Sequence, residues 1–466
     1  MSRPNILFIM DDQHRFDYLG VAGAVFVRTP NIDALATSGV RFTQCTTNAP
    51  VCAPSRIGLA SGLHPCRLGG LDNASFLPPD TTSYYQRLRD GGYRVGCVGK
   101  LDLAKAWTYN GRYGDRPCAY QWGFTHPEEC EGKMHAGSSA TPIGPYTHFL
   151  AERGLLQTFH GDYRQRKGDW VKGGSPDSAL PTDAFEDSYI GHRAAAWIDD
   201  IADDFPWHLF VSFVGPHDPF DPPTEYADRY RGADMPDAVA ADTADKPAWI
   251  TNRVVDMSAD EVAISRRQYC AAIELIDDQV GQIFTALERR GMTENTHIIF
   301  ASDHGEMLGD HGLYSKSVAY EASLRVPLVI AGPGIEGGRV SDSLVELIDL
   351  NPTICQLAGL PPQGGIDGLS LVPVIDGRSE THRTETVSAL RNFRCLRSER
   401  YKLIQNYNSV TELYNLEEDP EELRNLAGYE PDIVRGLGQR LRAGDGRVDL
   451  AQERGAHATS GRMRVS

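Results

Sequence analysis

Four short apolar runs, each followed at once by polar or charged residues, constrain the fold of this chain most. They span residues 5–10, 93–98, 207–214 and 297–302. Segments of helical periodicity lie between them, with one helix expected to begin at Thr29 and another to run from about Ala271 to Arg290. Strands that alternate with helices predict an α/β fold, with a large and mostly parallel sheet flanked by helices.

Polar side chains follow each expected strand. These residues are Asp12, Lys100, His217 and the pair Asp303–His304. Ligands of open α/β sheets bind beyond the carboxyl ends of the strands, so we expect these side chains to converge on one site. Carboxylates with one imidazole suit a hard divalent cation better than zinc, with Ca²⁺ as the first choice and Mg²⁺ or Mn²⁺ as alternatives.

The pattern changes after about Thr381. Short apolar runs at 386–390, 393–397 and 401–404 are separated by polar turns, which predicts a small antiparallel sheet. We therefore expect a large α/β domain over residues 1–375 and a smaller C-terminal α+β domain over 376–466. The segment 132–181, rich in Gly, Ser, Thr and Pro, is expected to be an insertion that forms part of a substrate pocket.

Composition excludes several classes of protein. The chain has 466 residues, enough for one large and one small domain, and its formal net charge of −17 argues against nucleic acid or an anionic membrane as a partner. It contains no run of 18 apolar residues, so no spanning helix is expected. Nine cysteines without repeated spacing, and an N-terminus that leads straight into the first strand, predict reduced thiols in a cytoplasmic protein.

One motif carries a resemblance to a known family. Cys52-Ala53-Pro54-Ser55-Arg56 reads C-x-P-S-R and resembles the signature of the type I sulfatases of the alkaline phosphatase superfamily. The segments 302–314 and 325–334 are similar to bacterial sulfatases, and 412–420 is similar to the ending that sulfatases commonly show. The resemblance covers most of the chain and is closest to the branch of choline-sulfatase-like, phosphonate-monoester-hydrolase-like and iduronate-sulfatase-like proteins.

The resemblance implies a nucleophile and a metal site. In that family a formylglycine-generating enzyme oxidises the motif cysteine to formylglycine, whose hydrated aldehyde attacks sulfur. Cys52 would then be the nucleophile and contact a divalent cation held by Asp12, Gln13, Asp303 and His304. A shift of one residue would instead place the pair Asp11–Asp12 on the cation, and this alternative stays open.

The resemblance also implies roles for four further residues. Arg56, one helical turn after Cys52 if a helix begins there, would steady the formylglycine. Lys100 and Lys316 would bind sulfate oxygens and stabilise the charge of the transition state. His217 would protonate the leaving oxygen or contact the sulfate, since imidazole donates a proton near neutral pH.

Asn73 and Asp102 are expected to contact the substrate. Asn73 matches an asparagine of the choline-sulfatase-like and phosphonate-hydrolase-like branch. Asp102 stands where sulfatases commonly have the histidine of a Gly-Lys-x-His sequence. A carboxylate there would either act as a base toward the diol or bind a nearby basic residue, and it puts a simple transfer of substrate class in doubt.

The sequence thus favours an enzyme that hydrolyses a sulfate ester of a small organic molecule or saccharide and releases inorganic sulfate. A phosphonate monoester or phosphodiester hydrolase with the same nucleophile is the alternative, because sulfuryl and phosphoryl groups demand similar donors. A non-catalytic binding protein of the same fold is the third hypothesis. A homo-oligomer is possible on this sequence.

Overall fold

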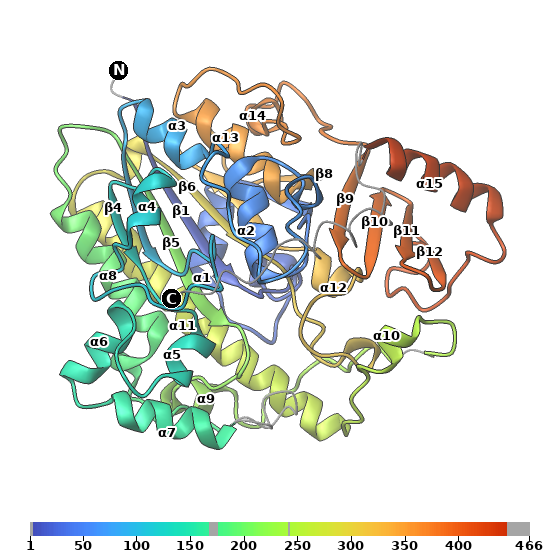
Figure 1. Ribbon diagram of the computed structural model, residues 1–466, viewed down its shortest axis with the longest axis horizontal. Coiled ribbons are helices and arrows are strands. Elements are labelled where there is room, and N and C mark those ends of the chain that lie inside the picture. Colours follow the sequence, from blue (N-terminus) through green and yellow to red (C-terminus); the bar gives the residue numbers. More distant parts are fainter. Residues whose placement is uncertain (1–2, 167–175, 241–242, 445–466) are drawn as a thin grey trace, which may run out of the picture.

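The computed structural model describes residues 3–166, 176–240 and 243–444. Within these ranges the main sheet has eight strands in the order β4-β3-β5-β1-β6-β7-β2-β8 (Figure 1). Their bounds are β1 Asn5–Asp12, β2 Gly39–Thr46, β3 Arg94–Gly99, β4 His126–Glu129, β5 Trp207–Pro216, β6 Thr296–Ser302, β7 Leu328–Ala331 and β8 Arg339–Glu346. Neighbouring strands pair in parallel, except that β7 runs antiparallel to β6 and β2. The prediction of a large, mostly parallel sheet is confirmed.

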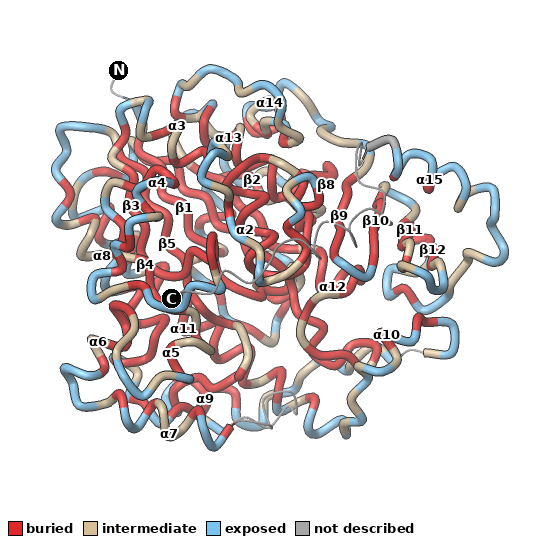
Figure 2. Tube along the Cα trace, in the orientation of Figure 1, coloured by how far each residue is buried: buried red, intermediate tan, exposed pale blue. Residues whose placement is uncertain are grey.

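The central strands are buried on both faces. Every residue of β1 is buried, and so is every residue of β5 and β6 (Figure 2). Successive side chains of a strand point to opposite faces, so Ile6 and Phe8 belong to one hydrophobic cluster while Leu7 and Ile9 belong to another. This explains why β1 reads as a continuous apolar run rather than as an alternating one.

Two groups of helices cover these faces. On the side of Leu7 lie α1 (Pro30–Thr37), α8 (Glu186–Asp200) and α11 (Ala259–Arg289), and on the side of Ile6 lie α2 (Cys52–Ser61), α3 (Tyr84–Asp90) and α13 (Leu350–Leu357). The shorter or peripheral helices are α4 (Pro117–Gln121), α5 (Lys133–Ser138), α6 (Pro145–Glu152), α7 (Leu156–Arg166), α9 (Thr224–Tyr230), α10 (Ala248–Thr251), α12 (Glu321–Leu324) and α14 (Val372–Ile375). The expected helix start at Thr29 is confirmed, because α1 begins at the next residue.

Helix α11 begins twelve residues earlier than the sequence predicted, at Ala259 instead of about Ala271. Its N-terminus has a capping box, in which Ser258 and Glu261 each accept a hydrogen bond from the other's backbone N–H. The first half of the helix buries polar residues such as Ser265 and Arg266. The sequence of this half therefore shows no apolar stripe from which a helix could be predicted.

A second sheet lies beside the first and contains four antiparallel strands in the order β12-β11-β10-β9 (Figure 1). Its elements are β9 Glu385–Leu390, β10 Phe393–Ser398, β11 Tyr401–Asn406, β12 Thr411–Asn415 and the covering helix α15 Pro431–Gly444. Leu437 and Leu441 of α15 pack against Leu396 and Leu403 of the sheet. The predicted C-terminal antiparallel sheet is confirmed, and residues 445–466 of that predicted domain lie outside the described part of the chain.

The expected insertion at 132–181 contains α5, α6 and α7, and its residues 167–175 lie outside the described ranges. All nine cysteines fall within those ranges, and none forms a disulfide. No described helix combines the length and the apolar character that crossing a bilayer requires.

Candidate active site

The carboxyl ends of four adjacent strands bring the predicted residues together. Asp12 is the last residue of β1, Lys100 follows β3, His217 follows β5, and Asp303 follows β6. These strands are neighbours in the order β3-β5-β1-β6, and their parallel pairing places all four ends at one edge of the sheet.

Asp12, Cys52, Asp303 and His304 form a group that we call the nucleophile cluster. One ligand atom from each lies within 4.8 Å of every other, and all four residues are buried. The Cys52 Sγ lies 3.3 Å from His304 Nε2, which is 3.7 Å from an oxygen of Asp303 and 3.8 Å from an oxygen of Asp12. Two facing carboxylates away from water are costly without a compensating cation, so this donor set fits a hard divalent ion.

Burial and the neighbouring charges act on the two carboxyls in opposite directions. Burial and the adjacent Asp12 raise the pKa of Asp303. Burial would also raise the pKa of Asp12, but Lys100, His217 and Arg56 outweigh it and hold that pKa well below its usual value. In the folded chain Asp12 is therefore ionised more readily than Asp303.

Asp11 lies on the other side of β1. Its carboxylate accepts a hydrogen bond from His14 Nδ1 at 2.5 Å, and the residue is fully buried. Consecutive strand residues face opposite ways, which separates Asp11 from the nucleophile cluster. The geometry therefore favours the register with Asp12 over the pair Asp11–Asp12.

Helix α2 presents Cys52 as its first residue, after the extended residue Val51. The Ser55 hydroxyl donates to the backbone carbonyl of Asp303 at 2.7 Å and fixes this end of the helix against β6. Burial and Asp12 raise the pKa of the Cys52 thiol, but Lys100 and other lysines outweigh both and leave that pKa well below its usual value. The position thus stabilises negative charge, as a helix N-terminus also does.

All three guanidinium nitrogens of Arg56 donate hydrogen bonds inside the site. Its Nε donates to Asp303 at 2.7 Å and one Nη donates to Asp12 at 3.1 Å. The other Nη donates to the carbonyl of Lys100 at 2.8 Å and to the hydroxyl of Ser212 at 2.7 Å. The planar fork therefore ties α2 to three strand ends and neutralises part of the carboxylate charge.

Asp102 pairs with two lysines. Its Oδ2 accepts a hydrogen bond from Lys105 Nζ at 2.8 Å and lies 3.2 Å from Lys100 Nζ, which itself bonds Asp12. Burial raises the pKa of Asp102, but the two lysines outweigh it and lower that pKa. Of the two possibilities for this carboxylate, the geometry supports the binding of a nearby basic residue.

A second network surrounds Lys316. The Lys316 ammonium donates to the side-chain oxygen of Gln13 and to His217 Nε2. His217 Nδ1 donates to the carbonyl of Asp218 at 2.6 Å, which is consistent with Nε2 as the acceptor. The Gln13 amide nitrogen donates to Asp218 and Glu306. Because Lys316 engages the Gln13 oxygen, a metal-ligand role for Gln13 stays a prediction.

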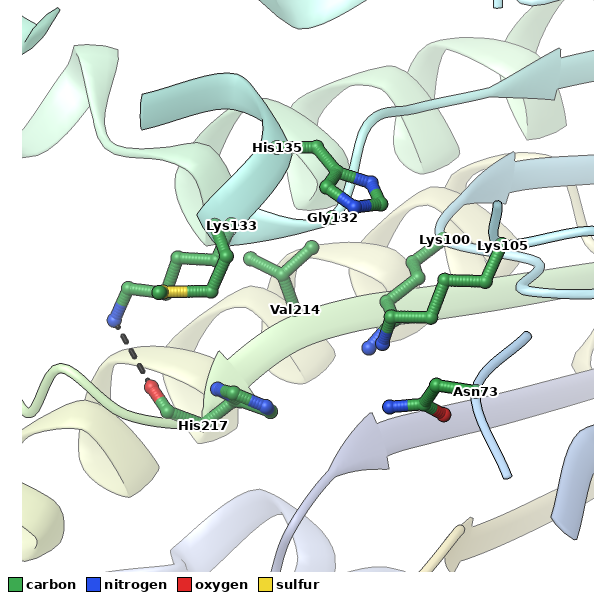
Figure 3. Close-up of a pocket in the computed structure, with 9 residues that line it drawn as sticks. Asn73, Lys100, Lys105, Gly132, Lys133, His135, Val214 and His217 are labelled. Atoms are coloured by element: carbon green, nitrogen blue, oxygen red, sulfur yellow. Dashed lines mark hydrogen bonds between the residues drawn. The ribbon is translucent and has the colours of Figure 1, made fainter. Parts of the chain in front are cut away.

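A cavity of about 190 Å³ opens beside these networks (Figure 3). It is lined by Asn73, Lys100, Lys105, Gly132, Lys133, Met134, His135, Val214 and His217. The Asn73 oxygen accepts a hydrogen bond from the backbone N–H of Ala53 at 3.1 Å, so its amide nitrogen is left for the cavity. The expected insertion thus supplies Gly132 to His135 to the cavity wall, while a role in substrate binding stays a prediction.

Sequence reasoning missed three basic residues of this wall, namely Lys105, Lys133 and His135. Lys105 stands three residues after Asp102, a spacing that could have suggested their pairing. Lys133 and His135 lie in the segment expected to contribute to the pocket, but nothing in its composition singles them out. Lys133 pairs with buried Asp221 at 2.6 Å.

Comparisons with known proteins agree on one family. The Sulfatase family model matches residues 4–360, and the model of the N-sulphoglucosamine sulphohydrolase C-terminal region matches 309–443. An arylsulfatase of Clostridium perfringens is 30% identical over 92% of this chain and 91% of its own length. A choline-sulfatase of Rhizobium meliloti is 30% identical over 91% of this chain and 83% of its own length. The phosphonate monoester hydrolase structure of Agrobacterium radiobacter superposes with a TM-score of 0.80 at 26% identity, covering 95% of this chain and 96% of the other.

Proposed function

Because this chain belongs to the sulfatase family and hydrolyses sulfate esters, we propose that it acts through a formylglycine formed from Cys52 and a bound divalent cation. The observation that supports this best is the buried nucleophile cluster, in which the C-x-P-S-R cysteine lies beside two carboxylates and one imidazole. Asp12, Asp303 and His304 would hold the cation, with Gln13 next to them and Ca²⁺ as the ion that suits the oxygen donors.

Formylglycine at Cys52 would supply a geminal diol as the attacking group, and loss of the proton of its second hydroxyl would expel sulfate and restore the aldehyde. A cation held by Asp12, Asp303 and His304 would supply positive charge for the sulfuryl oxygens and for the attacking hydroxyl. Arg56 would orient the modified side chain, since it lies one turn after Cys52 on α2 and already bonds Asp12 and Asp303. Its fixed fork keeps these groups in place without a rearrangement during the reaction.

Lys100, Lys316 and His217 would act on the sulfate group and the leaving oxygen. The two ammonium groups have different partners in the site, since Lys100 bonds Asp12 and Lys316 bonds Gln13 and His217. Both stabilise the charge that develops on sulfuryl oxygens. The proton between Lys316 and His217 would be available to the leaving oxygen. Asn73 and the Asp102–Lys105 pair would contact the rest of the substrate.

We take the substrate to be a sulfate ester of a small organic molecule or a saccharide. A formylglycine-generating enzyme would mature the chain. None of the nine cysteines forms a disulfide, which supports a reducing compartment, and we take this compartment to be the cytoplasm. A homo-oligomer stays a prediction from the sequence.

The mass of the peptide that spans Cys52 tests the proposal. The protein is produced in its native host or together with a maturation enzyme, and the peptide is expected to show the mass loss of a thiol converted to an aldehyde. A peptide of unmodified mass under both conditions would contradict the proposed nucleophile.

A phosphonate monoester hydrolase is the second candidate function, and the superposition with such an enzyme over 95% of this chain favours considering it. The relative kcat/KM for an aryl sulfate and for phenyl phosphonate distinguishes the two. We expect the aryl sulfate to be the better substrate, and a preference for phenyl phosphonate would reverse the assignment.

A further inference from the structure

Two aromatic rings are exposed next to the candidate active site. Phe76 and Trp107 leave 52% and 58% of their surfaces open to solvent. Their rings lie nearly parallel, with centroids 6.4 Å apart and an angle of 16° between the planes. We call this pair the aromatic platform. Among the described residues, it is the only stacked pair of rings in which both members are exposed.

The platform stands on the loops that build one side of the cavity. Asn73 and Lys105 line the cavity, three residues before Phe76 and two residues before Trp107. The two loops are joined by a bridge between Phe76 and Ala104 and by a hydrogen bond from Leu77 N–H to the Leu103 carbonyl at 2.8 Å. The loops that carry the platform are therefore the same two loops that supply Asn73 and Lys105 to the cavity wall.

A buried ion pair holds the platform in place. Arg116 donates to the backbone carbonyl of Trp107 at 3.0 Å and binds both oxygens of Glu129 at 2.5 Å. Trp107 N–H also donates to the Ala104 carbonyl at 3.0 Å. A surface that is fixed before binding loses little conformational entropy when a ligand lies on it. Two neighbouring apolar side chains that are each about half exposed form a surface patch that a ligand can cover.

The polar groups beside the platform restrict what can lie on it. The Lys105 ammonium has three donors and bonds Asp102 with one, and the Asn73 amide nitrogen faces the cavity. His135 lines the same wall, and Figure 3 shows it across the cavity from Asn73. A purely apolar group would leave these donors unpaired, which costs free energy.

We propose that the aromatic platform binds the ring of a saccharide whose sulfate group enters the cavity. A pyranose has an apolar face of C–H groups and an edge of hydroxyls, so it matches flat rings beside polar donors. The sulfate would lie toward Lys100 and His217, and the hydroxyl edge would face Lys105 and Asn73. The proposal deepens the proposed function, since it names the substrate class of the same site and rests on sulfate-ester hydrolysis there.

A binding experiment tests this proposal separately from catalysis. Protein made without the maturation enzyme keeps the Cys52 thiol, and calorimetry measures its Kd for glucose 6-sulfate and for inorganic sulfate. Trp107→Ala is expected to raise the Kd for glucose 6-sulfate by about tenfold and to change the Kd for inorganic sulfate by less than about twofold. Trp107→Phe, which keeps a ring, should retain most of the affinity for glucose 6-sulfate.

Tyr429→Ala is the matched control, because Tyr429 is an aromatic residue with 74% exposure near the C-terminal sheet. It should change neither Kd. No binding of glucose 6-sulfate to the wild-type chain, an unchanged Kd in Trp107→Ala, or an equal loss for inorganic sulfate would each overturn the platform. The mass of the Cys52 peptide decides the proposed nucleophile independently of all three outcomes.

Discussion

Two buried groups of charged side chains differ in what surrounds them. The nucleophile cluster lies at the carboxyl edge of the main sheet, and its neighbours Lys100 and His217 open onto a cavity. The second group, which we call the C-terminal cluster, consists of Glu321, Arg397, Lys402 and Glu422 and joins α12 to β10 and β11. Both groups hold carboxylates and cations away from water, yet only the first has the features of a reaction site.

The charged side chains of the C-terminal cluster pair with one another. Glu321 accepts hydrogen bonds from Arg397 at 2.9 Å and from Lys402 at 3.0 Å, and Lys402 also bonds Glu422. Lys402 has no exposed surface. Arg325 also lies 3.5 Å from Glu321, so each buried carboxylate of the cluster has a cation beside it. The comparison teaches that buried charge alone does not mark an active site, whereas donors that face a cavity do.

Replacing Cys52, the proposed nucleophile, should have the largest effect on activity and should leave stability intact. Cys52→Ala is expected to lower kcat for sulfate release by at least about 10³-fold, because no other side chain can supply the attacking group. Steady-state release of sulfate and urea unfolding measure the two quantities. Cys45→Ala is the control, since Cys45 is equally buried in β2 but lies outside the cluster. Retained activity in Cys52→Ala would remove the distinction between the two clusters.

The C-terminal cluster should show the reverse pattern. Lys402→Met leaves two buried carboxylates without this cation and is expected to lower the free energy of unfolding by about 3–5 kcal/mol. The folded variant should keep the wild-type kcat. Arg400→Met is the control, because Arg400 is half exposed and its loss should cost at most about 1 kcal/mol. A matching loss of kcat in folded Lys402→Met would show that this cluster acts on the reaction.

Arg56→Lys tests whether the active site needs the directed hydrogen bonds of the guanidinium or only its positive charge. Lysine keeps the charge but cannot make the four directed hydrogen bonds of the guanidinium, so kcat is expected to fall by about 10²-fold. The exposed pair of Arg67 with Asp367 offers a control, and Arg67→Lys should change kcat little. An Arg56→Lys enzyme with wild-type kcat would mean that charge alone is what this position supplies.

Asp102→Asn should have the smallest effect. The amide keeps the size of the side chain but removes the charge that holds Lys105 and Lys100, and kcat/KM is expected to fall by about tenfold. Asp90→Asn, at an exposed pair with neighbouring Arg89, serves as the control. A loss as large as that of Cys52→Ala would instead assign the Asp102 carboxylate a direct part in the reaction.

The sequence predicts the strand ends well because each lies where an apolar run stops. Asp12, Lys100 and Asp303 could be placed at one edge of a sheet from the alternation of strands and helices. The strands β2, β4, β7 and β8 were not predicted. The strands β4 and β7 are only four residues long, and residues that are not buried interrupt the apolar pattern of β2 and β8.

The residues of the cavity wall could not be predicted from apolar runs in the sequence. Lys105 lies in a loop and His135 in the short helix α5, and the positions of such peripheral segments depend on contacts far away in the sequence. The bond from Arg116 to the Trp107 carbonyl and the pairing of Arg116 with Glu129 are such contacts. No local pattern of residues encodes them, so only the folded chain shows which basic residues face the cavity.

Because Cys52 is completely buried in the folded chain, its proposed conversion to formylglycine would have to come before folding is complete. In the folded chain the thiol is buried and lies 3.3 Å from His304 Nε2, so this covering side chain is absent until the ribosome has added more than two hundred further residues. At usual rates of translation this interval is on the order of tens of seconds. An enzyme that converts Cys52 must act within that interval or on a chain not yet folded. A slower ribosome or a delayed fold would raise the converted fraction, and rapid refolding of unmodified protein would trap the thiol.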